Sequence, residues 1–377
     1  MTGLPRRPVA ILGSGLFGMG LAVGGFGTYV SELVVRGVAP SVAGFGATLF
    51  LFGQFAVVWP TDVFARLSSV RLAAAVGLGL GTIGTALGGA LSVPVALGGR
   101  LVLGLGMGTT FLAAMTYAGL CVDEGRIARL QGLLGATFTL GLAVGIAVTP
   151  WAVAQYGATP PAIVAAVPVA ASTGLSLSLS PVEGREYRPF AEYVDAFRTP
   201  GGIGLGLANG ASYGLLIVAT TWYTDVLARA PALPATLVLT GFAVATFVGR
   251  TYSGRLGAVM TPRRAVEAGL VFLAVSLGLV ALALWLQASL LLAVALVLTG
   301  AGFGLPFGPL FSLAFASVEA DAGVLLVGMT AIGNAVALAY PWLVGQLLEA
   351  TAGYAAGLAV MALSTAAVVG VWRVTLW

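Results

Sequence analysis

Long apolar runs separated by short polar breaks repeat along the whole chain. Each run is long enough to cross a bilayer, since a helix needs about 20 apolar residues to span roughly 30 Å of hydrocarbon. Lipid cannot satisfy backbone polar groups, so only helices and closed barrels span it, and the 55 glycines favour close helix packing over a barrel. The pattern predicts an all-α membrane protein with twelve transmembrane helices at 9–35, 40–65, 70–91, 94–120, 129–153, 158–179, 201–227, 232–257, 264–286, 288–316, 322–347 and 351–373.

The amino-acid composition excludes several classes of protein function. The chain of 377 residues is 59% hydrophobic and 8% charged, with a mean hydropathy of +1.04, which excludes a water-soluble globular protein. It has no histidine, and a single cysteine, Cys121, excludes an internal disulfide. We therefore expect no metal, no cofactor and no enzymatic chemistry, because a nucleophile motif and a metal-ligand cluster are also missing from the sequence. A non-transporting sensor is the less favoured alternative, since no soluble output domain is visible.

Charge distribution predicts the topology. Under a twelve-helix layout most arginines fall in loops on the side of the two termini, and only Arg36 and Arg229 fall opposite. The positive-inside rule then places both termini in the cytoplasm of a multi-pass protein of the cytoplasmic membrane. This layout explains the basic pI of about 9.5 without a nucleic-acid partner. We expect a monomer, which is the default for such an architecture.

The chain divides into two similar halves. An offset of 196 (300 − 104) aligns a Gly-x-Gly-x-Gly run at 104–108 with another at 300–304, and an offset of 193 (225 − 32) aligns an acid and an arginine at 32 and 36 with those at 225 and 229. We predict bundles at 1–180 and 201–377 joined by a polar connector at 181–200, where Phe190, Val194 and Phe197 share one face of an amphipathic helix on the membrane surface. Duplicated halves predict a solute cavity between them.

Two short motifs carry a family resemblance. Asp62-Val63-Phe64-Ala65-Arg66 followed by Arg71, and its counterpart from Gly254-Arg255 to Arg263-Arg264, resemble the cytoplasmic loop signature of the major facilitator superfamily. The run from Arg100 to Gly106 resembles the family's signature in span four. The resemblance implies two pseudo-twofold-related six-helix bundles and a secondary transporter that works by rocker-switch alternating access. It also implies that Asp62 and Arg66, with charged residues at 123–129 and 319–321, form a cytoplasmic network that stabilises the outward-facing state.

Arg250 is the leading candidate for substrate binding. Its place in Gly249-Arg250-Thr251 looks like that of the eighth-helix arginine with which the oxalate, monocarboxylate and nitrate carriers of the superfamily meet their anions. A guanidinium stays charged and can donate two parallel hydrogen bonds to a carboxylate. The alternative is a packing role on the cytoplasmic side. By the offset of 196, Gln54 stands where the nitrate carriers have a second, symmetry-related arginine. The cavity is therefore expected to hold one fixed positive charge, which favours a monovalent organic anion. The other predicted cavity residues are Asn209, Tyr117, Tyr213, Asn334 and Tyr340, with packing as the alternative for each aromatic.

Further charges are candidates for coupling and gating. Arg100 lies inside span four, where burial costs roughly 2.5–3.5 kcal/mol; by resemblance it couples the cavity to gating, and the alternative is a snorkelling side chain. Glu32 with Arg36, and Asp225 with Arg229, have i,i+4 spacing. They are either exposed pairs worth about 0.3–0.5 kcal/mol each or partners that exchange while an acid takes up a proton. An alternative substrate class is a neutral or amphipathic molecule.

Overall fold

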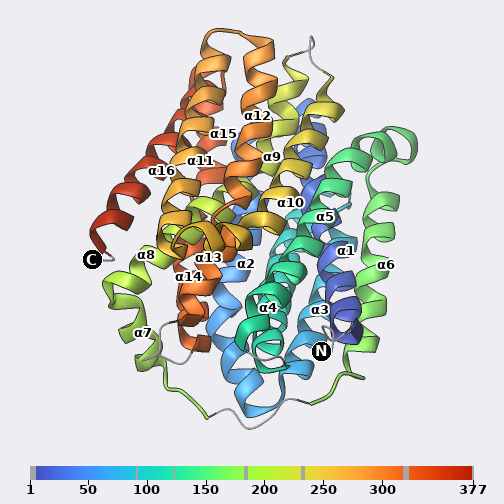
Figure 1. Ribbon diagram of the computed structural model, residues 1–377. Coiled ribbons are helices and arrows are strands. Elements are labelled where there is room, and N and C mark those ends of the chain that lie inside the picture. Colours follow the sequence, from blue (N-terminus) through green and yellow to red (C-terminus); the bar gives the residue numbers. More distant parts are fainter. Residues whose placement is uncertain are drawn as a thin grey trace.

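The computed structural model describes residues 6–90, 92–121, 124–181, 186–230, 234–316 and 322–375. Within these ranges every regular element is a helix (Figure 1). Twelve helical segments are long and apolar enough to cross a membrane, so the predicted count of transmembrane helices is confirmed. The observed ends lie within a few residues of the predicted ones for most spans.

The first six long helices pack against one another. Their bounds are α1 Arg6–Val35, α2 Pro40–Leu67, α3 Val70–Leu87, α4 Val93–Cys121, α5 Glu124–Tyr156 and α6 Thr159–Ser176. Helix α1 contacts α5 and α6, while α4 contacts α2 and α3. Glycine makes the closest of these approaches possible: a Cβ on Gly141 of α5 would lie 2.0 Å from the carbonyl oxygen of Phe17 in α1.

The second set of helices contains three interruptions. Its members are α8 Pro200–Asn209, the π-helix η1 Gly210–Gly214, α9 Leu215–Ala228, α10 Ala235–Val259, α11 Pro262–Trp285, α12 Ser289–Gly304, α13 Phe307–Ala316, α14 Ala322–Ala337, α15 Tyr340–Thr351 and α16 Ala355–Thr375. The segments α8, η1 and α9 form one span. The break before α13 contains Pro306, and the break before α15 is followed by Pro341 in the first turn of that helix. Proline has no N–H for the helical ladder.

The aligned glycines lie at equivalent helix–helix contacts in the two halves. A Cβ on Gly104 of α4 would lie 2.1 Å from the carbonyl oxygen of Phe50 in α2, and one on Gly300 of α12 would lie 2.1 Å from that of Phe242 in α10. Equivalent glycines therefore allow equivalent helix pairs to approach each other equally closely, as expected for a duplicated bundle. The division at 1–180, 181–200 and 201–377 stays a prediction.

Helices of the two sets meet along a seam. Helix α1 contacts α9, α2 contacts α14 and α15, and α5 contacts α10. At the end away from α7, here called the distal end, the backbone N–H of Ser41 donates to Glu349 Oε1 at 2.8 Å, and Thr48 Oγ1 donates to the carbonyl oxygen of Leu338 at 2.9 Å. A Cβ on Gly44 would lie 2.5 Å from the carbonyl oxygen of Pro341. The seam is closely packed at this end.

Helix α7 (Phe190–Arg198) lies at the opposite end, here called the connector end (Figure 1). It touches both halves: the rings of Trp59 in α2 and Phe190 have centroids 5.0 Å apart, and the ring of Phe197 lies against Gly328 of α14. The predicted amphipathic helix in the connector is therefore present, and its apolar face packs on protein as well as being available to lipid.

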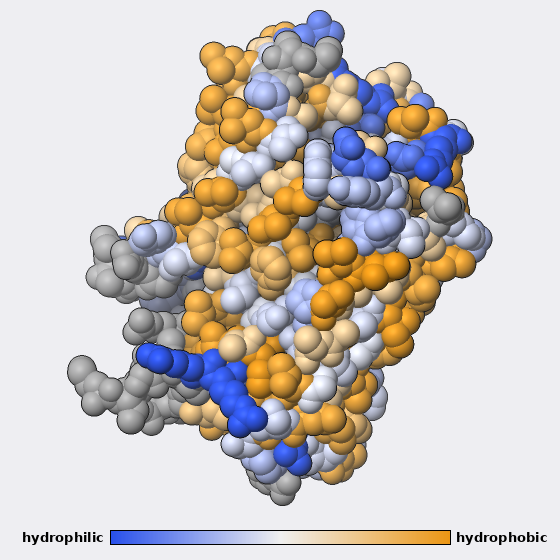
Figure 2. Space-filling model, turned by 90° about the vertical axis from the view of Figure 1, so that its right-hand side faces the viewer, coloured by the Kyte–Doolittle hydropathy of each residue, from blue (hydrophilic) through white to orange (hydrophobic). Residues whose placement is uncertain are grey.

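Apolar side chains cover the outside of the bundle. Figure 2 shows one face on which apolar residues dominate the middle and hydrophilic residues gather mainly toward the ends. Large exposed apolar side chains include Val164, Leu237 and Leu290, each at least two-thirds exposed. A surface of this kind requires lipid as its solvent.

Candidate functional site

Four polar side chains meet at the seam between the halves. The hydroxyl of Tyr213, in the π-helix η1, donates to Gln54 Oε1 in α2 at 3.0 Å. Arg250 Nη1, in α10, donates to Thr139 Oγ1 in α5 at 3.0 Å. Both hydrogen bonds join residues from different halves, and we call these four residues the seam cluster. The interrupted helix at η1 is a feature that often accompanies functional sites.

Aromatic rings surround the seam cluster. The guanidinium carbon of Arg250 lies 4.4 Å from the ring centroid of Phe307 and 5.9 Å from that of Tyr213. Phe111 of α4 stacks on Tyr213 at 6.4 Å and meets Phe311 of α13 edge-on at 6.0 Å. These rings exclude water from the arginine, and cation–π attraction offsets part of the cost of its burial.

Several hydrogen-bond donors of the seam cluster are unused. Arg250 Nε and Nη2 and Gln54 Nε2 are buried and have no hydrogen-bond partner among the described residues. Arg250 and Gln54 are each 2% exposed. The Nε and Nη2 atoms form one edge of the guanidinium, which is the edge that binds a carboxylate through two parallel bonds. Since a buried polar group without a partner costs about 1–3 kcal/mol, this edge is suited to a polar ligand.

The two predicted asparagines lie beside each other in the second half. Asn209 of α8 donates to the carbonyl oxygen of Met329 at 3.3 Å. Asn334 of α14 is fully buried, and neither its Nδ2 nor its Oδ1 has a partner in the described part of the chain. Gly333 allows this approach, because a Cβ there would lie 2.5 Å from Asn209 Nδ2. The pair adds further unused hydrogen-bonding capacity to the second half.

Two predicted aromatic contacts lie elsewhere. Tyr117 of α4 interacts with Cys121 of the same helix and with the backbone of Ser180, toward the connector end. Tyr340 begins α15 and is partly buried against the core, next to the distal contacts of Pro341. Their role in substrate binding stays a prediction that the described contacts do not support.

Arg100 is buried within the first half. It is 2% exposed, so its guanidinium does not reach the surface as a snorkelling side chain would. Its guanidinium carbon lies 3.8 Å from the ring centroid of Phe26 and 4.8 Å from that of Phe50. Like Arg250, it leaves Nε and Nη2 without a hydrogen-bond partner among the described residues.

The predicted i,i+4 pairs form at the distal end. Arg36 Nη2 lies 2.6 Å from Glu32 Oε1, and both side chains are exposed. Arg229 Nε lies 3.1 Å from Asp225 Oδ2, whose side chain is 8% exposed. The hydroxyl of Tyr354 also donates to Asp225, and burial raises the pKa of Tyr354, with the Asp225 carboxylate adding to the shift. In each pair the acid lies in the last turns of a helix and the arginine directly follows the end of that helix, so exchange of partners across the seam stays a prediction.

Asp62 and Arg66 form a buried group at the connector end. Arg66 Nε donates to Asp62 Oδ2 at 2.7 Å, and Arg66 Nη1 donates to the carbonyl oxygen of Glu186 at 2.7 Å. Tyr193 of α7 donates to the same Asp62 oxygen at 2.5 Å. We call this set, with Tyr193 and Glu186, the connector clamp. The predicted network members Asp123, Glu319 and Asp321, and the side chains at 124–129, lie outside the described residues.

Sequence reasoning missed Thr139, Tyr193 and Tyr354. Each is an ordinary hydroxyl residue in its own segment, and each finds its partner more than 100 residues away. The sequence did contain a signal for Phe111 and Phe307, because the offset of 196 aligns these two aromatic positions. No pattern within one segment could have paired the hydroxyls with Arg250, Asp62 or Asp225.

Comparison with known proteins identifies the family. The family model for the Major Facilitator Superfamily matches residues 11–341. The xylose transporter XylE from E. coli, in a partially occluded inward open conformation, has 14% identity and a TM-score of 0.77, covering 98% of this chain and 97% of its own. The E. coli fucose:proton symporter FucP, in a variant form, has 17% identity and a TM-score of 0.69, covering 98% of both chains. A search of curated proteins by sequence gave no match. The chain therefore belongs to the Major Facilitator Superfamily, and it is a membrane transporter rather than an enzyme.

Proposed function

We propose that this transporter carries a small monovalent organic anion, of the monocarboxylate type, bound at the seam cluster. The observation that supports this proposal is the unused Nε–Nη2 edge of Arg250. A carboxylate would accept both hydrogen bonds and neutralise the buried charge, whose described contacts are a hydrogen bond to Thr139 and aromatic rings. Gln54 Nε2 is a further donor in the same cluster.

The charge of the site favours one carboxylate over two. Among the described residues that hydrogen-bond or pack their rings within the seam cluster, Arg250 is the only cation, although the charge of Arg100 also acts on Tyr213. Gln54 occupies the position related to Arg250 by the internal repeat. A second carboxylate would be buried against phenyl rings without a counter-charge, at a cost of several kcal/mol. One fixed positive charge and a ring of aromatic side chains suit a small anion with an apolar body.

Transport would proceed by rocking of the two halves about the seam. Because Arg250 and Tyr213 bind partners in the first half, separation of the halves at either end would expose them to water. We further propose a monomer in the cytoplasmic membrane with both termini inside, as the arginine distribution indicates. Proton coupling through Glu32 or Asp225 belongs to the same proposal, because both carboxylates lie near the distal end of the seam.

A neutral solute is the second candidate. The amides of Gln54 and Asn334 include two donors and one acceptor without partners among the described residues, and rings such as Phe111 and Phe311 offer flat apolar faces. A polyhydroxy solute could use such groups without a charge. The structural neighbours XylE and FucP are named as a xylose transporter and a fucose:proton symporter. A sugar is therefore the neutral solute that we include in the test.

Uptake into proteoliposomes tests the two candidates directly. Purified protein would be assayed with labelled short monocarboxylates, a dicarboxylate and neutral sugars, each with and without an imposed pH gradient. For the anion proposal we expect saturable monocarboxylate uptake, which Arg250→Gln lowers about tenfold to a hundredfold, since bonds to charged groups are worth about 1.5–3 kcal/mol. Arg250→Lys keeps the positive charge but lacks the planar pair of N–H donors of the guanidinium, and it should retain only part of the uptake.

A matched control separates a local effect from a general loss of charge. Arg264→Gln makes the same substitution at an exposed arginine at the start of α11 and should leave uptake at the level of the unmodified protein. Monocarboxylate uptake that survives Arg250→Gln would reject the anion assignment. Sugar uptake without anion uptake would support the second candidate instead.

A further inference from the structure

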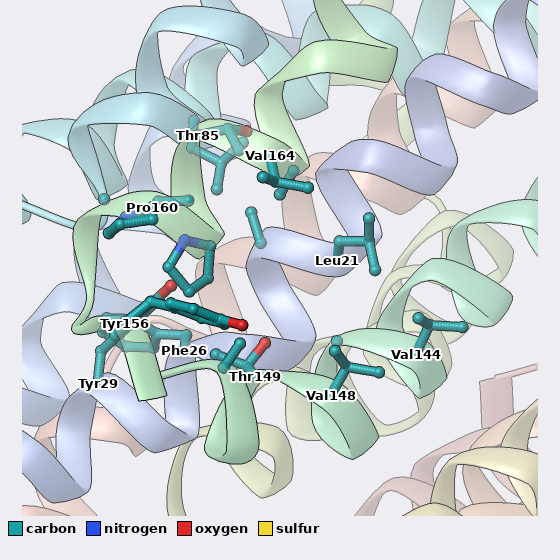
Figure 3. Close-up of a pocket in the computed structure, with 18 of the residues that line it drawn as sticks. Leu21, Phe26, Tyr29, Thr85, Val144, Val148, Thr149, Tyr156, Pro160 and Val164 are labelled. Atoms are coloured by element: carbon teal, nitrogen blue, oxygen red, sulfur yellow. The ribbon is translucent and has the colours of Figure 1, made fainter. Parts of the chain in front are cut away.

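A cavity of about 350 Å³ lies inside the first bundle, apart from the seam cluster. Helices α1, α3, α4, α5 and α6 all contribute to its walls. Figure 3 shows labelled side chains of α1, α3, α5 and α6 around one space. The lining residues belong to the distal halves of these helices. They include Phe26, Thr85, Arg100, Val148, Trp151 and Val164.

The cavity opens sideways between α5 and α6. Trp151 and Tyr156 at the distal end of α5 are 58% and 63% exposed, and Val164 of α6 is 68% exposed. The neighbouring apolar residues Ile163 and Val167 on α6 are also exposed, so this side of the bundle faces lipid. The Tyr29 hydroxyl donates to the carbonyl oxygen of Ala158 at 3.4 Å, which ties α1 to the loop before α6. Access from the bilayer is therefore lateral.

Two buried polar side chains in the cavity wall have atoms without a hydrogen-bond partner in the described part of the chain. Arg100 is 2% exposed, and its Nε and Nη2 have no hydrogen-bond partner among the described residues. Thr85 is 1% exposed, and its Oγ1 is likewise unpartnered. The remaining wall is almost wholly apolar, with side chains such as Leu21, Val144 and Val148. The inner wall carries a positive charge and the passage to the lipid is apolar. A ligand that fits therefore has a negative charge at one end and an apolar body.

We propose that this cavity binds a single-chain lipophilic carboxylic acid that enters from the bilayer, with its carboxylate at Arg100 and its apolar body between α5 and α6. The guanidinium edge would donate two parallel hydrogen bonds to the carboxylate, and Thr85 would add a third. The volume is near the lower end of the range of small-molecule pockets, about 300–1,000 Å³. It suits one chain rather than a two-chain phospholipid.

Phe26 lies beside the charge in the cavity wall. The Arg100 guanidinium carbon lies 3.8 Å from the centroid of its ring, and the same ring lines the cavity. The ring provides a cation–π contact to a face of the guanidinium, whereas a carboxylate would bind the in-plane Nε–Nη2 edge. Ring contact and carboxylate binding are therefore compatible.

The cavity shares no lining residue with the seam cluster. The two sites are near enough for the charge of Arg100 to act on Tyr213, but the solute proposed for the seam need not be lipophilic. The cavity could bind its acid whether or not the seam carries an anion, and an Arg250 variant distinguishes the two proposals.

Quenching of tryptophan fluorescence tests the proposal in nanodiscs of zwitterionic lipid. The probe is a decanoic acid with bromine at its far end, which quenches a tryptophan only at contact range. The chain has seven tryptophans, so the signal of Trp151 is taken as the difference between the protein and its Trp151→Phe variant. We expect saturable quenching of Trp151 by the acid, with at least tenfold weaker quenching by the matching brominated alcohol.

Four variants locate the bound acid. Arg100→Gln should weaken binding at least tenfold, and Ala152→Phe, which fills the cavity beside Trp151, should abolish it. Ala154→Phe places the same ring on an exposed position of α5 outside the cavity and should bind normally, as should Arg250→Gln. Equal quenching by acid and alcohol, no saturable quenching, or unchanged binding in Arg100→Gln would overturn the proposal. Loss of binding only in Arg250→Gln would move the acid to the seam and overturn it as well.

Discussion

Tyr193→Phe removes the hydroxyl that joins helix α7 to the buried carboxylate of Asp62. The hydrogen bond is 2.5 Å long, and Tyr193 is fully buried. A hydrogen bond to a charged group contributes about 1.5–3 kcal/mol, and Asp62 keeps its bond to Arg66, so the loss lies toward the lower value. Each 1.4 kcal/mol is a factor of ten. The fraction of molecules with α7 undocked from α2 should therefore rise at least tenfold.

Hydrogen exchange measured by mass spectrometry reports this change. Backbone amides of 190–198 exchange when α7 leaves its site, so their exchange should accelerate by the same factor. Tyr187→Phe makes the same substitution six residues earlier, where the side chain is 51% exposed, and should leave the exchange unchanged. If both variants exchange alike, the hydroxyl of Tyr193 does not hold α7 in place.

The pH dependence of the clamp follows from the same contact. Burial raises the pKa of Tyr193 above its usual 10, and its hydrogen bond to the Asp62 carboxylate adds to the shift. The folded pKa is raised, so the stabilising contribution is complete below the unfolded value and is lost as pH rises through the folded value. Docking of α7 through Tyr193 should thus be insensitive to pH near neutrality and should weaken only in strongly alkaline solution.

Two further substitutions test the packing of the seam and of the first bundle. Glu349→Ala removes the acceptor of the Ser41 N–H and with it a contact that joins α15 to α2. A thiol reagent should therefore react faster at Ala47→Cys, a buried position of α2, in a background without the native cysteine. Unchanged reactivity would count against Glu349 as a distal contact. Gly141→Ala should lower the unfolding temperature in detergent, because its Cβ would lie 2.0 Å from a carbonyl oxygen of α1 and overpacking costs typically 1–3 kcal/mol. Gly174→Ala, with nothing within 4 Å, should be neutral or stabilising, and an equal loss in both would refute the role of close contact.

The sequence predicted the helices well because each span is apolar over its whole length. It predicted the duplication because glycines at 104–108 and 300–304 are needed at the same helix contacts, and the structure gives Gly104 and Gly300 the same 2.1 Å approach. The π-helix at 210–214 and the break at 305–306 were missed, because the hydrophobic pattern continues through both. Hydropathy senses the solvent around a helix and not its internal hydrogen bonding.

The candidate site was predictable only in part. Arg250 stood out because a charge in an apolar run requires an explanation, and Gln54 followed from the internal repeat. The contact of Gln54 with Tyr213 joins residues 159 positions apart, and no periodicity within one segment reports such a distance. Tyr117 was predicted as an uncharged cavity contact, yet its neighbours are Cys121 and Ser180, because the face a helix residue presents depends on how the bundle is assembled.

The two buried arginines differ in one respect that matters for transport. Both leave the same guanidinium edge unused, but Arg100 rests between two rings of its own half, whereas Arg250 bonds to Thr139 across the seam. A ligand shifts an equilibrium between two conformations only if it binds them with different affinities. Occupation of Arg100 leaves the contacts between the halves in place, while an anion on Arg250 competes with or reinforces a bond that rocking must break. The arginine that bridges the halves is therefore the one through which solute binding can change the balance between the two orientations.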